Sequence, residues 1–296
     1  MKKKTRNLII IICVIIFLAA GFFLYYHFFR KRVDIIIFMG QSNIAGRGST
    51  SEIWPETAPE VMKGAGWEFR AVTDPSKLYP IQEPFGIDEN LTNFVDDEKN
   101  KTGSLVSAFV NAYYSDNGNV PVVAVSASKG GTTIMGWAYN GGYLHDAITR
   151  LKSARSFVEQ SGYLVRHIYA VWCQGESDAD RHTQQINYYS AFEDTVSQLK
   201  NAGVEKVLMI SIGHMNDEKH WDLYEDMIAW QADIADKFPD VVMVSDDFTT
   251  MRDRGLMKDA YHYYQAGYNE CGTIAGKNAA MFARHGKTGA LHFTEE

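Results

Sequence analysis

Short apolar runs alternate with amphipathic segments along most of the chain. Five runs have the length and the β-branched content of buried strands: Val33 to Phe38, Val120 to Ser126, Val165 to Trp172, Glu205 to Ile212 and Val241 to Ser245. The segments between them repeat apolar residues at helical spacing, over 105–112, 148–158, 192–199, 221–238 and 265–283. Strands that alternate with helices predict a three-layer α/β/α sandwich built on a five-stranded parallel sheet.

One long segment, residues 45–102, breaks this pattern. It contains five prolines with scattered glycine and tryptophan and shows no clear period. An irregular insertion of this length inside a domain is usually functional or mobile. Because it follows the first strand and Ser42 directly, we expect it to form part of one wall of a cleft. Trp54 and Trp67 within it are candidates to stack on a sugar ring, although packing against the domain is the commoner role of such side chains.

The first 32 residues differ in character from the rest. Four basic residues precede an apolar run from Leu8 to Phe29, which is long enough to cross a bilayer as one helix, and Arg30-Lys31-Arg32 follows it. The run stays apolar past any plausible cleavage point for a signal peptide. The sequence therefore predicts a basic amino terminus and transmembrane anchor over 1–32, followed by a single domain over 33–296.

The basic residues around this run also predict an orientation. Four basic side chains and the terminal amine precede it and three basic side chains follow it, which favours an amino terminus inside and a domain outside the cell. We therefore expect a single-pass protein of the cell membrane with an extracellular catalytic domain. Since almost no linker separates the run from the first strand, the amino edge of the sheet should face the membrane and the cleft should open away from it.

The net charge of the predicted domain argues against nucleic acid as a partner. The whole chain carries a formal charge of −7, but residues 1–32 contain seven basic residues and no acid, so the remainder has 22 basic and 36 acidic residues, a net charge of −14. Such a domain repels polyanions. Its substrate should be neutral or cationic, or be held by local contacts that outweigh the net charge. Three cysteines provide no disulfide framework; Cys173 and Cys271 are expected as buried thiols, with a bridge between them left open.

Two segments at opposite ends of the domain suggest hydrolytic chemistry. Ser42 follows the carboxyl end of the first predicted strand, where α/β hydrolases often place a nucleophile. Asp259 and His262 are three residues apart, so that a carboxylate can orient the imidazole within one turn. Each segment alone fits a helix cap as well. Their combination predicts a serine esterase site.

Candidate oxyanion donors follow two further strands. Residues 127–133 contain two glycines that allow close backbone approach to a ligand, and Gln174 precedes Gly175 and Glu176 at the end of another strand. Because parallel strands end at one edge of a sheet, these segments should converge on the cleft that contains Ser42.

These motifs resemble those of a known group. The residues that carry the resemblance are Gly40-Gln41-Ser42-Asn43, Ala45-Gly46-Arg47-Gly48, Lys129-Gly130-Gly131-Thr132 with Trp137, Gln174-Gly175-Glu176, and Asp259-Ala260-Tyr261-His262. In this order they resemble the SGNH-hydrolase superfamily, in its sialate O-acetylesterase-like branch, carbohydrate esterase family 6. The similarity extends from residue 33 to about 285 and implies an SGNH, flavodoxin-like fold.

The resemblance implies specific roles. Ser42 would be the nucleophile, His262 the general base and Asp259 its partner. The oxyanion hole would comprise the amides of Ser42 and Gly131 and the side chain of Gln174. The wider superfamily has Gly-x-Asn-Asp where this chain has Gln174-Gly175-Glu176, which leaves Glu176 as an alternative acid for orienting His262. No metal and no organic cofactor is required.

The expected function is a membrane-anchored serine esterase that removes O-acetyl groups from carbohydrate, sialate or polysaccharide, through an acyl-enzyme. Two alternatives remain: a catalytically silent carbohydrate-binding surface protein, and an SGNH lipase or thioesterase that uses the same residues. Other polar clusters are weaker candidates for a functional site. His214, Asp217 and His220 lack a stereotyped metal-ligand spacing, Asp246-Asp247 fits a turn, and Gly40 to Gly48 lacks the ending of a phosphate-binding loop.

Overall fold

A computed structural model describes residues 3–28, 30–89 and 100–293. Its strands are β1 Arg32–Gly40, β2 Gly66–Phe69, β3 Leu78–Pro80, β4 Val122–Ser128, β5 Leu164–Cys173, β6 Lys206–Ile210 and β7 Val241–Ser245. Its helices are α1 Lys3–Phe28, α2 Ser42–Ala45, α3 Val106–Asp116, α4 Gly142–Gln160, α5 Glu176–Asp180, α6 Gln185–Asn201, α7 Glu225–Lys237, α8 Phe248–Met251 and α9 Gln265–His285. Short 3₁₀ helices cover Ile134–Gly136 and Glu218–His220.

Strand β1 lies at the centre of the sheet, whose order is β3-β2-β4-β1-β5-β6-β7. Because successive side chains of a strand point to opposite faces, β1 contributes to two cores. Ile35 and Ile37 pack in one core, and Ile36 and Phe38 pack in the other. The strand is therefore apolar without interruption from Ile35 to Met39, which explains why the sequence reveals it so clearly.

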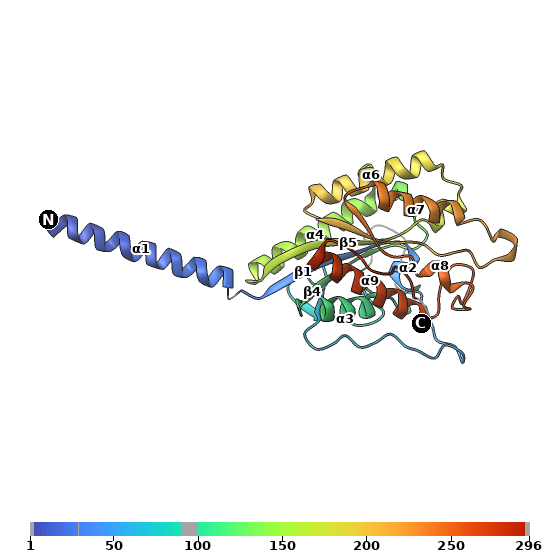
Figure 1. Ribbon diagram of the computed structural model, residues 1–296, viewed down its shortest axis with the longest axis horizontal. Helices are drawn as coiled ribbons and strands as arrows, with labels where there is room; N and C mark the ends of the chain where they lie inside the picture. The colour runs from blue at the N-terminus through green and yellow to red at the C-terminus, as the bar shows by residue number, and fades with distance from the viewer. Residues whose placement is uncertain (1–2, 29, 90–99, 294–296) are drawn as a thin grey trace.

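Helices cover both faces of the sheet and form the predicted three layers (Figure 1). Residues of α4, α6 and α7 complete the first core, and residues of α3 and α9 complete the second. The five predicted strands and the five long predicted helices are all present, with ends shifted by a few residues. The α/β class and the parallel core of the sheet are thus confirmed.

The sheet has seven strands, so the prediction of five strands is wrong. The two extra strands, β2 and β3, come from the segment 45–102 that was expected to be irregular. β2 runs parallel to β4, and β3 pairs antiparallel with β2 and forms the edge of the sheet. Both are too short to produce a recognisable period, and Pro80 is tolerated at the end of β3 because an edge strand needs fewer backbone donors.

The amino-terminal helix α1 extends away from the rest of the molecule (Figure 1). Within residues 3–28, 30–89 and 100–293, no helix meets the length and apolarity needed to cross a membrane. The structure therefore does not support the predicted transmembrane helix.

The register of the three central strands brings their carboxyl ends to one level. Gly40 at the end of β1 pairs with Ser128 in β4 and with Cys173 in β5. The loops that follow these strands begin with Gln41, Lys129 and Gln174. Three of the predicted site segments therefore meet at one edge of the sheet.

Candidate active site

Ser42 begins the short helix α2, directly after the turn that ends β1. Gly40 makes this turn with a φ of +128°, and the Gln41 amide donates to the Cys173 carbonyl at 2.9 Å. Ser42 is 9% exposed and lines a cavity of about 530 Å³. The turn therefore presents the hydroxyl to an open space at the edge of the sheet.

His262 and Asp259 lie beside this hydroxyl. The Nε2 atom of His262 is 3.0 Å from Ser42 Oγ, and its Nδ1 atom is 3.0 Å from Asp259 Oδ2. Asp259 Oδ1 also accepts hydrogen bonds from the backbone amides of Tyr261 and His262, each at 2.8 Å. The three residues predicted from the sequence are thus in contact in the order Ser42, His262, Asp259.

The environment favours a neutral imidazole and a charged carboxylate. Burial lowers the pKa of His262 below its usual value, and this effect outweighs the hydrogen bond to Asp259, which acts to raise it. Burial acts to raise the pKa of Asp259, but hydrogen bonds from the Tyr261 amide and from His262 lower it overall. A neutral imidazole next to a hydroxyl and an oriented carboxylate can accept the hydroxyl proton.

Glu176 occupies a different place from the one expected of a histidine-orienting acid. Its Oε1 atom accepts from Asn43 Nδ2 at 2.6 Å, whereas the carboxylate that contacts His262 is Asp259. Asn43 in turn donates to the Tyr261 carbonyl at 3.2 Å and accepts from the Tyr268 hydroxyl at 2.7 Å. Glu176 therefore supports the loop that carries His262 through Asn43.

Burial gives Glu176 an unusual titration. The side chain is 3% exposed, and its Oε2 atom has no hydrogen-bond partner among the described residues. Burial raises its pKa to about 7, against the hydrogen bond from Asn43 that lowers it. This carboxyl group thus keeps its proton to a higher pH than an exposed glutamate does.

Ser42 and Gly131, two of the three residues predicted to supply oxyanion donors, both line the cavity. The Ser42 amide belongs to the first turn of α2, where backbone N–H groups have no partner within the helix. Gly131 lines the cavity with a φ of +71°, and a Cβ atom added there would meet no heavy atom within 4 Å. Both residues therefore line the cavity into which the Ser42 hydroxyl opens.

The third prediction, the side chain of Gln174, is contradicted by the structure. Gln174 is fully buried and is absent from the lining of the cavity. Its Nε2 atom donates to Thr132 O at 3.0 Å and to Asp178 Oδ2 at 2.5 Å. Since both amide protons have interior acceptors, Gln174 cannot serve as the predicted donor.

The sequence did not predict a role for several residues that line the cavity. Further residues that line the cavity are Gln41, Arg47, Asn100, Lys129, Gly130, Tyr143, Glu176, Ser177, Asp180 and Tyr261. Arg47 and Asn100 belong to the segment 45–102, which therefore contributes to the wall as predicted. Trp54 and Trp67 do not line the cavity; Trp54 donates to the Gly255 carbonyl, and Trp67 packs against Tyr163.

The remaining polar candidates form separate contacts. His214 pairs with Glu225 and His220 pairs with Asp217, and the described part of the chain contains no group of side chains able to hold a metal ion. Cys173 and Cys271 are buried free thiols, so the bridge that was left open is not formed.

Residues 32–280 match the model of a protein family described as carbohydrate esterase, sialic acid-specific acetylesterase. The chain belongs to this family. The match spans both the sheet and the Ser42, His262 and Asp259 site. As a member of this carbohydrate esterase family, the protein is a carboxylic ester hydrolase of the SGNH type.

Two solved structures share the fold of this carbohydrate esterase. An X-ray structure of a protein from Arabidopsis thaliana aligns with 85% of this chain and 98% of its own, at a TM-score of 0.60 and 19% identity. A carbohydrate acetylesterase from Xanthomonas citri aligns with 86% of this chain and 57% of its own, at a TM-score of 0.53 and 14% identity. A comparison with curated proteins gave no match.

Proposed function

We propose that this esterase removes O-acetyl groups from a carbohydrate through an acyl-enzyme on Ser42. The observation that carries the proposal is the unbroken chain of contacts from Ser42 Oγ through His262 to Asp259, at 3.0 Å for each step. Asp259 holds the imidazole so that Nδ1 carries the proton and Nε2 can accept one.

The reaction proceeds in two halves. Ser42 Oγ attacks the acetyl carbon and gives its proton to His262, and the carbonyl electron pair moves onto oxygen, next to the amides of Ser42 and Gly131. Collapse of this intermediate expels the sugar oxygen, which takes the proton from His262. Water then attacks the acetyl-serine by the same route and releases acetate.

Two basic side chains of the cavity support a sugar that bears a carboxylate as the substrate. Arg47 and Lys129 line the cavity with Ser42. The acidic residues Glu176 and Asp180 line it too, but their carboxyl groups accept hydrogen bonds from Asn43 and from the Tyr224 hydroxyl. A volume of about 530 Å³ is in the range that accommodates a small ligand. We therefore favour O-acetylated sialic acid as the substrate. Neutral acetylated xylan represents the other substrate class that the sequence left open, an acetylated polysaccharide.

Acetate release separates these substrates. We expect a higher kcat/KM for O-acetylated sialic acid than for acetylated xylan or acetylated peptidoglycan fragments. Arg47→Gln should raise KM for the acidic sugar and leave hydrolysis of p-nitrophenyl acetate nearly unchanged. A preference for the neutral polymer that Arg47→Gln does not alter would refute the acidic substrate and leave the esterase intact.

Ser42→Ala tests the enzyme itself. The variant should keep the fold by circular dichroism and lose acetate release, and only the unmodified protein should react with a fluorophosphonate probe. A protein that neither labels nor hydrolyses any acetyl ester would instead be a silent carbohydrate-binding protein. A preference for long acyl chains over acetyl would identify a lipase or thioesterase.

We also propose that residues 1–32 attach the protein to the membrane and that residues 33–296 form an extracellular domain. Only the sequence supports these proposals. The support is the apolar run from Leu8 to Phe29 between two basic clusters. Full-length protein should sediment with membranes and resist extraction by carbonate, and protease added to intact cells should digest the domain. Recovery of the protein in the soluble fraction after the carbonate wash would refute membrane attachment.

A further inference from the structure

Gln41 lies in the wall of the cavity, immediately before the proposed nucleophile. Its side chain is 3% exposed and lines the cavity together with Ser42, Gly131 and His262. Its position is set by the backbone, because the Gln41 amide donates to the Cys173 carbonyl at the end of β5. An amide side chain at this position can interact with a group bound to Ser42.

The oxygen of this side chain is fixed by the neighbouring loop. Gln41 Oε1 accepts from the backbone amides of Gly175 and Ser177, each at 3.3 Å, and lies 3.4 Å from Gln174 Nε2. The two backbone donors define which end of the Gln41 amide is the oxygen, because the amide nitrogen could not accept from them. The NH₂ group therefore points away from the loop that follows β5.

The nitrogen is left for the cavity. Among the described residues, Gln41 Nε2 has no hydrogen-bond partner in the structure, and it is not one of the buried polar atoms that lack a partner. It is thus reached from the cavity that Gln41 lines. An aspartate or glutamate here would accept the same backbone hydrogen bonds but would have no proton to donate.

Gln174 holds Gln41 in this orientation. Gln174 is fully buried, and its Nε2 atom is anchored by Asp178 Oδ2 and Thr132 O while it approaches Gln41 Oε1. It is a positioning residue behind the cavity. The donor role that the sequence assigned to Gln174 therefore falls to Gln41, the residue that Gln174 contacts.

We propose that Gln41 Nε2 is the third donor of the oxyanion hole, with the amides of Ser42 and Gly131. This inference rests on the proposed function. As the bond from Ser42 Oγ to the acetyl carbon forms and the proton moves to His262 Nε2, the carbonyl electron pair moves onto oxygen. Gln41 donates a hydrogen bond to that oxygen, and the bond weakens again when the intermediate collapses and the sugar oxygen leaves.

Gln41→Glu tests the proposal because it keeps the acceptor and removes the donor. The carboxylate that this substitution introduces can still accept from the amides of Gly175 and Ser177, so the fold should be retained. We expect kcat for p-nitrophenyl acetate to fall by about 10²- to 10³-fold, the usual effect of removing one oxyanion donor, with a much smaller change in KM. Gln41→Met removes the donor without adding charge and should show a loss of similar size.

A transition-state analogue separates catalysis from scaffold damage. A boronic acid that bonds to Ser42 Oγ mimics the tetrahedral intermediate, so its inhibition constant should rise in both variants in parallel with the loss of kcat. Inhibition by acetate should change little. Gln41→Glu or Gln41→Met that folds and keeps kcat within threefold of the unmodified protein overturns the proposal. If the unmodified protein releases no acetate and does not differ from Ser42→Ala, the proposed function itself fails.

Discussion

Contacts of single residues favour Asp259 over Glu176 as the acid that serves His262. Asp259 touches Nδ1 of the imidazole, whereas Glu176 touches Asn43. We therefore expect Asp259→Asn to lower kcat by at least about 10²-fold, because the amide no longer fixes the tautomer that accepts the Ser42 proton. Glu176→Gln retains an acceptor for Asn43 and should lose less than tenfold. Activity assays in which only Glu176→Gln is inactive would reverse the assignment.

The pH profile gives a second test of the same residues. His262 accepts a proton only when neutral, so kcat/KM should rise with pH through the His262 pKa, which burial places below its usual 6.5. The contacts with Asp259 act to raise that pKa. The residual activity of Asp259→Asn should therefore rise at a lower pH than that of the unmodified enzyme. If the activity of Asp259→Asn rises at a higher pH than that of the unmodified enzyme, the contacts with Asp259 do not raise the pKa of His262.

Glu176 should also leave a signature in stability. Burial raises its pKa from 4.5 to about 7, so the native state binds this proton more tightly than the unfolded state does. The contribution is fully present below about pH 4.5 and is lost as the pH rises through 7, at a cost of about 3 kcal/mol. Urea unfolding of Glu176→Gln should thus show a smaller decline between pH 4.5 and 8 than the unmodified protein. If the free energy of unfolding declines equally in both proteins, the pKa of Glu176 is not raised.

At the scale of elements, the turn between β1 and α2 depends on Gly40. A Cβ atom at this residue would lie 2.1 Å from the Cys173 carbonyl oxygen, and the φ of +128° disfavours any residue with a side chain. We expect Gly40→Ala to reduce the free energy of unfolding by about 3 kcal/mol or more and to displace Ser42.

Gly118 offers the matched control for this prediction. It also has a positive φ, +67°, but an added Cβ atom would meet no heavy atom within 4 Å. Gly118→Ala should therefore cost only the backbone strain, about 1 kcal/mol, and leave activity intact. Equal costs for the two variants in urea unfolding would show that the close approach to β5 is unimportant.

How far the elements could be predicted depended on their length and burial. The five parallel strands β1, β4, β5, β6 and β7 were visible because buried strands are continuous apolar runs. β2 and β3 were missed because four and three residues respectively carry no period, and their pairing with β4 is a tertiary contact. Ser42 was predictable because it follows the end of a strand, and Asp259 and His262 because they are three residues apart just before the last helix. The direction of the Gln174 amide was not, since Thr132 and Asp178 decide it.

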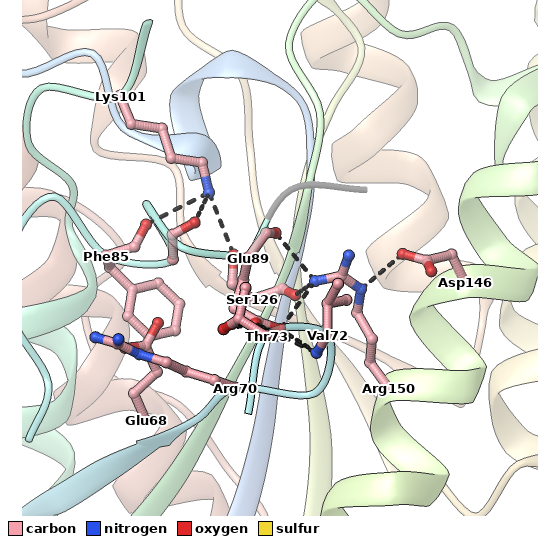
Figure 2. A network of polar contacts seen from close by, with 11 residues as sticks. Glu68, Arg70, Val72, Thr73, Phe85, Glu89, Lys101, Ser126, Asp146 and Arg150 are labelled. Atoms are coloured by element: carbon pink, nitrogen blue, oxygen red, sulfur yellow. Dashed lines mark hydrogen bonds and ion pairs between the residues drawn. The ribbon is translucent and has the colours of Figure 1, made fainter. Parts of the chain in front are cut away.

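At the scale of the whole molecule, buried charges connect the segment 45–102 to the rest of the domain. Glu89 and Arg150 are 1% and 2% exposed and approach within 3.3 Å (Figure 2). Glu89 also accepts from the amides of Val72 and Thr73, and Arg150 donates to the Ser126 carbonyl in β4. The network thus joins the segment, α4 and the strand that leads to Gly131.

Lys101 extends this network toward the cavity. Its ammonium group is buried and donates to the Gly86 carbonyl at 2.8 Å and to the Ser126 hydroxyl at 3.4 Å (Figure 2). The preceding residue, Asn100, lines the cavity. One side of this network therefore ends next to Asn100, and the other ends in the strand that leads to Lys129 and Gly131, so its loss should affect catalysis as well as stability.

Arg150→Met tests this connection. Removing one partner of a buried ion pair leaves the other charge uncompensated, so we expect a loss of about 3 to 5 kcal/mol in the free energy of unfolding by urea. Arg155→Met is the control on the same helix, because Arg155 pairs with Glu159 at 2.9 Å while both side chains are 48% exposed. That surface pair should contribute less than about 1 kcal/mol. Below its unfolding transition, Arg150→Met should also hydrolyse p-nitrophenyl acetate more slowly than Arg155→Met, because Ser126 leads to Gly131. Equal stability and equal activity of the two variants would mean that the network neither anchors the segment 45–102 nor supports the site.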